Sequence, residues 1–142
     1  MFKNLLATDD ARTTILVRLI VGTVFLSEGI QKFLYPLVLG PGRFEKIGLP
    51  APGVLANLVA SFEIVCGLMI LLGFMTRIAS IPLITIITVA ISTTKVDILI
   101  NDGFWKMMHE SRTDWSMLLG SIFLLIKGGG NWSFDRKFFK HD

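Results

Sequence analysis

The chain contains two long apolar runs in close succession: residues 54–74, VLANLVASFEIVCGLMILLGF, and residues 78–100, IASIPLITIITVAISTTKVDILI. Each run has the ~20 predominantly apolar residues that a helix needs to cross the ~30 Å hydrocarbon core of a bilayer. Because the connection between them is short, the two helices must be antiparallel neighbours. The sequence therefore predicts a membrane-spanning helical hairpin at the centre of the chain.

Two further spans flank this hairpin. Residues 14–35 form an apolar run that ends at Pro36, and a loop rich in glycine and proline follows over residues 37–52. The last span is predicted at about 108–127, although its uninterrupted apolar part, residues 115–126, is shorter than a bilayer requires. We therefore expect an all-α membrane protein, a single domain over residues 1–142. It would be a four-transmembrane-helix bundle with helices at about 14–35, 54–74, 78–100 and 108–127 and a short basic C-terminal tail.

The composition agrees with a membrane protein. Apolar residues make up 52% of the 142 residues and charged residues only 18%, against ~25% in a typical soluble domain. The net charge is +3, but the cations lie at the ends of apolar runs, which argues against nucleic-acid binding and for a role in topology. The first span lacks a small-residue cleavage site and is predicted to be a retained helix.

The distribution of Lys and Arg favours cytoplasmic termini. With both ends inside, the inner side carries seven cations: Lys3, Arg12, Arg77, Lys127, Arg136, Lys137 and Lys140. The outer side carries four: Arg43, Lys46, Lys106 and Arg112.

Ionisable residues inside the spans are the candidate site, because each costs ~2.5–3.5 kcal/mol near the bilayer centre. Arg18, Gly22, Phe25, Gly29 and Lys32 share one helical stripe, and the small glycines allow another helix to approach. A second stripe in the next span consists of Ala56, Ala60, Glu63 and Gly67, and a third, polar stripe consists of Thr85, Thr88, Ser92 and Lys95. We expect these faces to turn inward, so that the cations and carboxylates neutralise one another. The predicted intramembrane polar cluster is Arg18, Glu28, Lys32, Glu63, Arg77 and Asp114.

Two interpretations of this cluster remain open. The charges can fix helix register without a further role, since buried ion pairs add little net stability. They can also form a working site for a proton, an ion or a polar head group. Glu63 is the first choice for such a site because it lies deepest and has no partner at helical spacing in its own span. No catalytic residue is identified, and the sequence predicts no metal site.

Redox cofactors held by the chain itself are not predicted. A single cysteine, Cys66, excludes an internal dithiol and is expected to be a small buried hydrophobe. His109 and His141 lie outside the apolar cores, so no pair of haem ligands is placed at membrane depth.

The order and spacing of several motifs resemble the DoxX family of small four-helix membrane proteins. The matching residues are Arg18-x3-Gly22, Glu28-Gly29-x2-Lys32, Glu63-x3-Gly67, Leu72-Gly73-x2-Thr76-Arg77 and the closing Gly128-x-Gly130-x2-Ser133-x-Asp135. The resemblance implies a bacterial inner-membrane protein associated with quinol oxidation or with membrane complexes that handle oxidative stress. It implies no catalytic residue.

Three functions follow as hypotheses. The first is a subunit or accessory of a quinone-linked redox complex, with a quinone head group docked among Arg18, Lys32 and Glu63 and with other redox proteins as partners for the electrons. The second is a non-enzymatic scaffold or assembly factor in the lipid bilayer. The third is a small proton- or anion-conducting protein, which would require a homo-oligomer to form a path.

Overall fold

The described part of the chain is built from helices. The computed structural model describes residue 8 and residues 10–139, and these residues contain no strand. The helices are α2 (Thr14–Leu34), α3 (Pro41–Lys46), α4 (Pro52–Leu72), α5 (Thr76–Asp102), α6 (Phe104–Glu110), α7 (Arg112–Lys127) and α8 (Phe134–Phe139). By length and composition, α2, α4 and α5 are able to cross a membrane. Their bounds differ from the three predicted spans by at most two residues.

Helices α2 and α4 pack closely along their length because small residues line the contact. A Cβ added to Gly29 would lie 2.8 Å from the Ala60 carbonyl oxygen, and one added to Gly67 would lie 2.9 Å from the Leu26 amide nitrogen. A methyl group does not fit at these distances, so both positions require the hydrogen atom of a glycine. The two stripes predicted on these helices are buried, except for Lys32 on α2, which is half-buried.

The turn from α4 to α5 needs an unusual backbone. Gly73 and Met75 both have positive φ, at 68° and 48°, in a region that residues other than glycine rarely adopt. Asp135, which follows α7 by eight positions, holds this turn from outside. Its carboxylate accepts hydrogen bonds from the backbone N–H groups of Met75 and Thr76, at 2.5 and 2.9 Å, and so caps the first turn of α5.

The predicted helix over residues 108–127 is corrected by the structure, because the return segment is two helices and not one. Helix α6 ends at Glu110 and α7 begins at Arg112. At the break, the buried Ser111 donates through its hydroxyl to the Met107 carbonyl oxygen at 2.6 Å. Such a side-chain bond to the carbonyl of the preceding turn favours bending of a helix, and at Ser111 it coincides with the break, whereas the same bond at Ser80 and Thr85 leaves α5 continuous.

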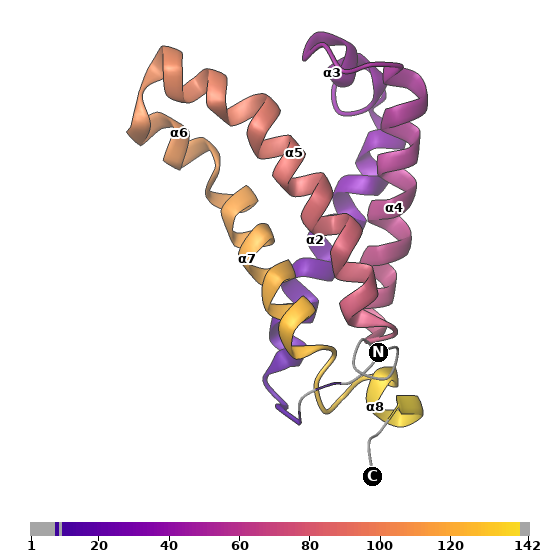
Figure 1. Ribbon diagram of the computed structural model, residues 1–142. Helices are drawn as coiled ribbons and strands as arrows, with labels where there is room; N and C mark the ends of the chain where they lie inside the picture. The colour runs from indigo at the N-terminus through magenta and orange to yellow at the C-terminus, as the bar shows by residue number, and fades with distance from the viewer. Residues whose placement is uncertain (1–7, 9, 140–142) are drawn as a thin grey trace.

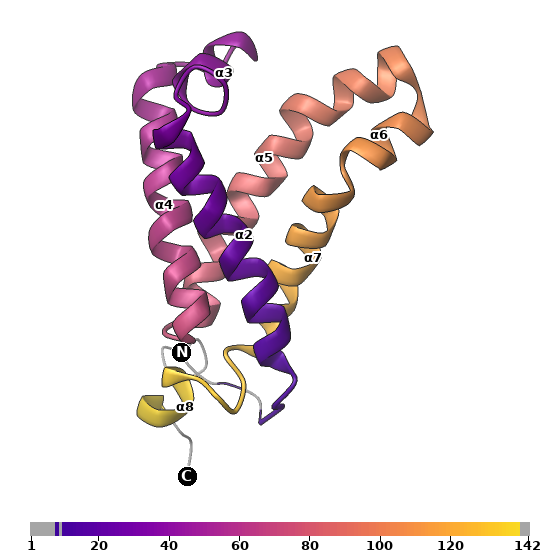
Figure 2. The same ribbon diagram turned by 180° about the vertical axis from the view of Figure 1, so that it is seen from behind.

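The helices form two arms arranged as a V (Figures 1 and 2). The first arm is α2, α3 and α4, and the second arm is α5, α6 and α7. The arms converge at the closed end, which holds the α4–α5 turn and α8, and diverge toward the open end, which holds α3 and α6. A core cluster joins them below the divergence; it includes Val21, Phe25, Cys66, Ile70, Leu83, Met117 and Leu124.

The start of α2 and the segment after α7 lie together at the closed end. The Gly130 N–H donates to the Thr8 hydroxyl at 2.6 Å, the Asn131 N–H donates to the Ala11 carbonyl at 3.2 Å, and Arg136 pairs with Asp10. The chain therefore leaves the closed end in α2 and returns to it in α7. Three residues used in the sequence predictions, Lys3, Lys140 and His141, lie outside the described residues.

Large apolar side chains face outward over much of the bundle. Leu19, Leu58, Val65, Ile81 and Val89 are all exposed on the three long helices. A soluble protein rarely leaves contiguous apolar surface of this extent in water. Such an apolar surface is stable in contact with the lipid chains of a bilayer.

Candidate functional site

A cavity of about 490 Å³ lies between the two arms, toward the open end. Its walls are mostly aliphatic and aromatic, and α3 contributes one side of it through Phe44, Ile47 and nearby residues. Seven ionisable side chains and four threonines interrupt these walls: Glu28, Lys32, Arg43, Glu63, Lys95, Glu110, Asp114, Thr85, Thr93, Thr94 and Thr113.

The first arm contributes an ion pair between its two long helices. Lys32 Nζ lies 2.7 Å from a Glu63 carboxylate oxygen and 3.9 Å from a Glu28 carboxylate oxygen. The Glu63 and Lys32 side chains are 5% and 12% exposed. Gly29 allows this pairing, because it brings α2 close to the Ala60 carbonyl oxygen and the Glu63 Cβ on α4. Glu28 lies one turn before Lys32 on α2 and forms an i,i+4 pair with it, and Glu63 obtains the partner that its own helix lacks.

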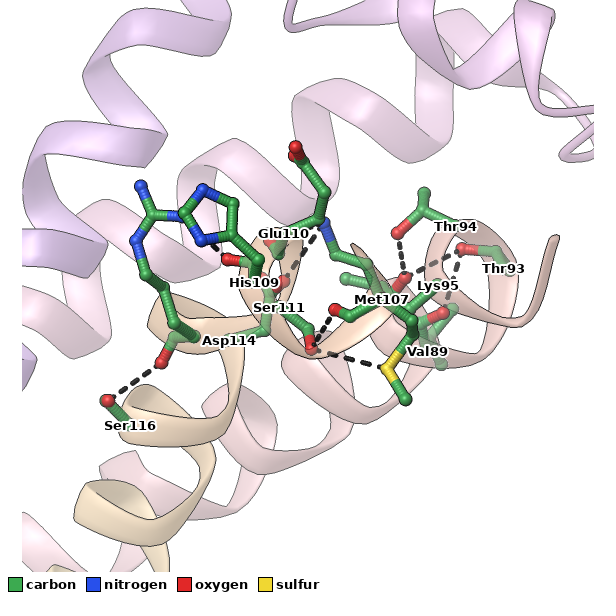
Figure 3. Close-up of polar contacts among 12 residues, drawn as sticks. Val89, Thr93, Thr94, Lys95, Met107, His109, Glu110, Ser111, Asp114 and Ser116 are labelled. Carbon is green, nitrogen blue, oxygen red and sulfur yellow. Dashed lines mark hydrogen bonds and ion pairs between the residues drawn. The ribbon is translucent and has the colours of Figure 1, made fainter. Parts of the chain in front are cut away.

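The second arm contributes a matching ion pair. Lys95 Nζ on α5 lies 3.3 Å from an Asp114 carboxylate oxygen in the first turn of α7. Lys95 also donates to the Glu110 carbonyl oxygen at 3.0 Å, which ties α5 to the end of α6 (Figure 3). The Lys95 and Asp114 side chains are 14% and 24% exposed. Asp114 belongs to the predicted cluster, but its pairing with Lys95 was not predicted. Lys95 is the last cation of α5, and Asp114 is the first acid of α7.

Arg18 lies at the closed end of the bundle, where its side chain donates hydrogen bonds to backbone carbonyl oxygens. Its guanidinium donates to Ile70 at 2.9 Å, Leu71 at 2.6 Å and Gly129 at 3.2 Å, and also to Trp132. Two of these carbonyls belong to the end of α4, and two belong to the segment that follows α7. Arg18 thus joins both arms below the cavity.

The expected grouping of Arg18 with Lys32 and Glu63 is therefore corrected. Arg18 and Lys32 share a helix face, but they are 14 positions apart, or about 21 Å along the axis at 1.5 Å per residue. Arg77 is also outside the cavity: it lies in the first turn of α5, at the closed end. Of the six predicted cluster residues, Glu28, Lys32, Glu63 and Asp114 line the cavity.

The polar stripe predicted on α5 is only partly turned inward. Thr85 and Lys95 line the cavity, but Thr88 and Ser92 are exposed on the outside of the helix. There the Ser92 hydroxyl donates to the Thr88 carbonyl at 2.9 Å. Thr93 and Thr94 line the cavity instead. Threonine and serine hydroxyl groups can donate hydrogen bonds to carbonyl oxygens of their own helix. A threonine or serine in an apolar span therefore does not show which face of the helix is internal.

The site thus combines apolar walls with charged and hydroxyl side chains, and small-molecule pockets also combine apolar walls with polar groups. Each lysine keeps its carboxylate partner in place, and each pair presents both a donor and an acceptor to the cavity. A ligand with a polar head and an apolar remainder matches this lining.

A helical membrane protein with paired charges around an internal cavity is the class that these observations define. A family model described as DoxX matches residues 13–96, and the chain belongs to the DoxX family. It is 52% identical to "Uncharacterized membrane protein Rv3486" of Mycobacterium tuberculosis (strain ATCC 25618 / H37Rv) over 143 aligned positions, which cover 96% of this chain and 88% of that protein.

A more distant relative has a name that refers to redox chemistry. "Putative oxidoreductase CatD" of Bacillus subtilis (strain 168) is 29% identical over 127 aligned positions, covering 89% of this chain and 87% of that protein. No solved structure matches the chain.

Proposed function

We propose that this protein is a subunit or accessory of a quinone-linked redox complex in the bacterial inner membrane, and that the cavity between the arms holds the quinone head group. The observation that carries the proposal is the buried Lys32–Glu63 pair, which faces a cavity with mainly apolar walls. The relative named "Putative oxidoreductase CatD" supports a redox association.

The residues present fit a quinone. The cavity volume of about 490 Å³ lies within the ~300–1,000 Å³ typical of small-molecule sites, so a ring and part of an apolar tail have room. Lysine ammonium groups donate to carbonyl oxygens, and Phe25 and Phe44 offer apolar contact for the ring.

Oxidation of a quinol to a quinone releases two electrons and two protons. In this proposal, Glu63 accepts one of the two protons at its carboxylate oxygen, as a general base within hydrogen-bond reach of the head group. The other proton passes to water at the open end of the cavity. Lys32 positions that carboxylate and compensates its charge. The electrons pass to a redox centre of a partner protein, which the complex must supply.

The proposal includes four membrane crossings with both termini in the cytoplasm. Helix α7 has only 16 residues, but it returns the chain to the end at which α2 starts. If α5 crosses the bilayer, the return segment α6–α7 must cross it as well. The excess of Lys and Arg at the closed end supports the cytoplasmic assignment of that end.

Quinone extraction tests the proposal. The protein would be purified in a mild detergent, extracted with solvent and assayed for quinone by mass spectrometry. We expect near-stoichiometric quinone in the wild type and at least a fivefold loss in Glu63→Gln. The matched control is Asp97→Asn on α5, which neutralises an exposed carboxylate outside the cavity and should retain the wild-type content.

A scaffold without redox activity is the second candidate, since each ion pair also joins two helices of one arm: α2 to α4, and α5 to α7. In that case the pairs fix helix register only. Wild-type protein without quinone would contradict the proposed function and favour this candidate. Glu63→Gln would then lower thermal stability, and the next measurement would be of co-purifying partners.

A further inference from the structure

The cavity has a lysine–carboxylate pair on each of its two walls, and only one of them is used in the function proposed above. Lys32–Glu63 belongs to the first arm and Lys95–Asp114 to the second. We propose that the cavity binds a flat head group at two points, with Lys32 donating to an oxygen on one edge and Lys95 to an oxygen on the opposite edge. This inference rests on the proposed function for the nature of the head group, a para-quinone.

Neither ion pair serves to hold the two arms together. Among the described residues, no hydrogen bond or ion pair joins residues 24–63 of the first arm to residues 85–117 of the second. The hydrogen bonds that hold the arms together lie at the closed end, at Arg18 and Asp135. Two ion pairs therefore face each other across a cavity, each complete within its own arm.

Each lysine has a donor left for a ligand. An ammonium group carries three N–H bonds. The closest contact of the Lys32 ammonium group is with the Glu63 carboxylate. The Lys95 ammonium group contacts the Asp114 carboxylate and the Glu110 carbonyl oxygen (Figure 3). The contacts within each arm also hold the ammonium groups in place, so that little side-chain freedom is lost when a ligand binds.

The second point of contact predicts a specificity. A para-quinone has carbonyl oxygens on opposite edges of its ring, and each can accept a charge-assisted hydrogen bond. A ring with one carbonyl can reach only one arm. The second arm should therefore set the preference for a head group with two oxygens, and the first arm should set affinity for both kinds of ligand.

The test compares two probe ligands on the full chain in nanodiscs. One is a para-naphthoquinone with methyl and decyl substituents, and the other is a decyl tetralone, which has a single carbonyl. Bound ligand is measured by mass spectrometry after subtraction of protein-free nanodiscs. The wild type should bind the two-carbonyl probe about tenfold more tightly, as expected for one additional hydrogen bond to a charged group.

The informative variant carries Lys95→Met and Asp114→Asn together. Its affinity for the two-carbonyl probe should fall to that for the tetralone, so that the ratio drops from about ten to about one, with tetralone binding unchanged. The matched control removes the other ion pair of the same arm, Lys106–Asp102, which is exposed and outside the cavity. Lys106→Met with Asp102→Asn should keep the wild-type ratio.

The outcomes separate this inference from the function on which it rests. A ratio that stays near ten in the Lys95–Asp114 variant overturns two-point binding and leaves the quinone site on the first arm intact. Equal loss of both probes shows a general defect of the second arm and also overturns the specificity argued here. If the double variant does not fold, Lys95→Met alone is measured in the same way. A wild type that binds neither probe overturns the proposed function itself.

Discussion

Arg18 and Lys32 show how residues with the same charge on one helix face take different roles. Lys32 reaches a carboxylate that faces the cavity, whereas Arg18 meets four carbonyl oxygens at the closed end. A guanidinium carries five N–H donors in a fixed plane, which suits several carbonyls that a single ammonium cannot satisfy together. Arg18 is buried, so it acts as a fixed connector between the end of α4 and the segment after α7.

Replacement of Arg18 should destabilise the bundle. Arg18→Ala leaves several carbonyl oxygens without their donor, and each buried unsatisfied group costs about 1–3 kcal/mol. We expect a loss of at least 3 kcal/mol, roughly two such groups, in unfolding by SDS titration followed by circular dichroism. Arg18→Lys should recover only part of it.

The control for Arg18 is Arg12→Ala, which removes the same side chain from an exposed position just before α2. Exposed substitutions of this kind usually change stability by less than about 0.5 kcal/mol. Equal stability of the Arg18 and Arg12 variants would contradict the connector role. Quinone content should remain near the wild-type value in any folded Arg18→Lys sample, because Arg18 lies outside the cavity.

At the scale of helices, the α2–α4 contact depends on hydrogen atoms in place of side chains. Gly29→Ala would place a methyl group 2.8 Å from the Ala60 carbonyl oxygen, a backbone atom that cannot move aside. Overpacking of this kind costs about 1–3 kcal/mol, and the same SDS titration measures it. The shift should also disturb the Lys32–Glu63 pair, which lies on the same contact.

Gly53→Ala is the matched control, since a Cβ at Gly53 would meet nothing within 4 Å and the residue lies in the first turn of α4. Alanine is favoured over glycine in a helix by about 0.5–1 kcal/mol, so this variant should be neutral or slightly more stable. A Gly29→Ala protein as stable as Gly53→Ala would show that the two helices separate without cost.

The second arm is anchored by a residue that comes after it in sequence. Asp135 caps α5 from beyond α7, and it compensates for a Met75 backbone in the left-handed region. This contact explains why the Ser133-x-Asp135 motif belongs to the same spatial unit as the Gly73-x2-Thr76 motif. The order of the motifs suggested the family, but only the fold shows that the two motifs contact each other at the start of α5.

At the scale of the whole molecule, hydrogen bonds at the closed end and the core cluster next to it hold the two arms together, and the cavity lies between the arms toward the open end. The Asp10–Arg136 pair places the start of α2 and the beginning of α8 on one side. An even number of crossings requires this arrangement. A chain with three crossings would place these residues on opposite faces of the membrane.

Single-cysteine labelling tests the number of crossings. In a Cys66→Ser background, cysteines would replace the exposed residues Arg12, Glu45, Asp102 and Lys137 one at a time. We expect a membrane-impermeant maleimide to label positions 45 and 102 in spheroplasts, and positions 12 and 137 only after permeabilisation. Labelling of position 137 together with position 45 would contradict four crossings. The parent protein, in which the buried Cys66 is intact, should react slowly in both conditions.

The sequence by itself determined the three apolar helices, the small-residue faces on α2 and α4, and the family. These features depend on residues close together in the chain, through length, hydropathy and a period of 3.6 residues. The sequence also allowed the prediction that four of the cavity residues lie inside the bundle: Glu28, Lys32, Glu63 and Asp114. A charge inside an apolar run costs free energy when it faces lipid, and it is therefore expected to face the interior.

Tertiary structure alone decided which charges meet. It separated Arg18 from Lys32, paired Lys95 with Asp114, brought Asp135 to the start of α5 and broke the return helix at Ser111. Periodicity gives the face of a helix on which a residue lies, but it gives neither the height of that residue relative to another helix nor the angle between two arms. Both depend on contacts between distant segments, so the cavity and its two facing ion pairs exist only once the arms are packed.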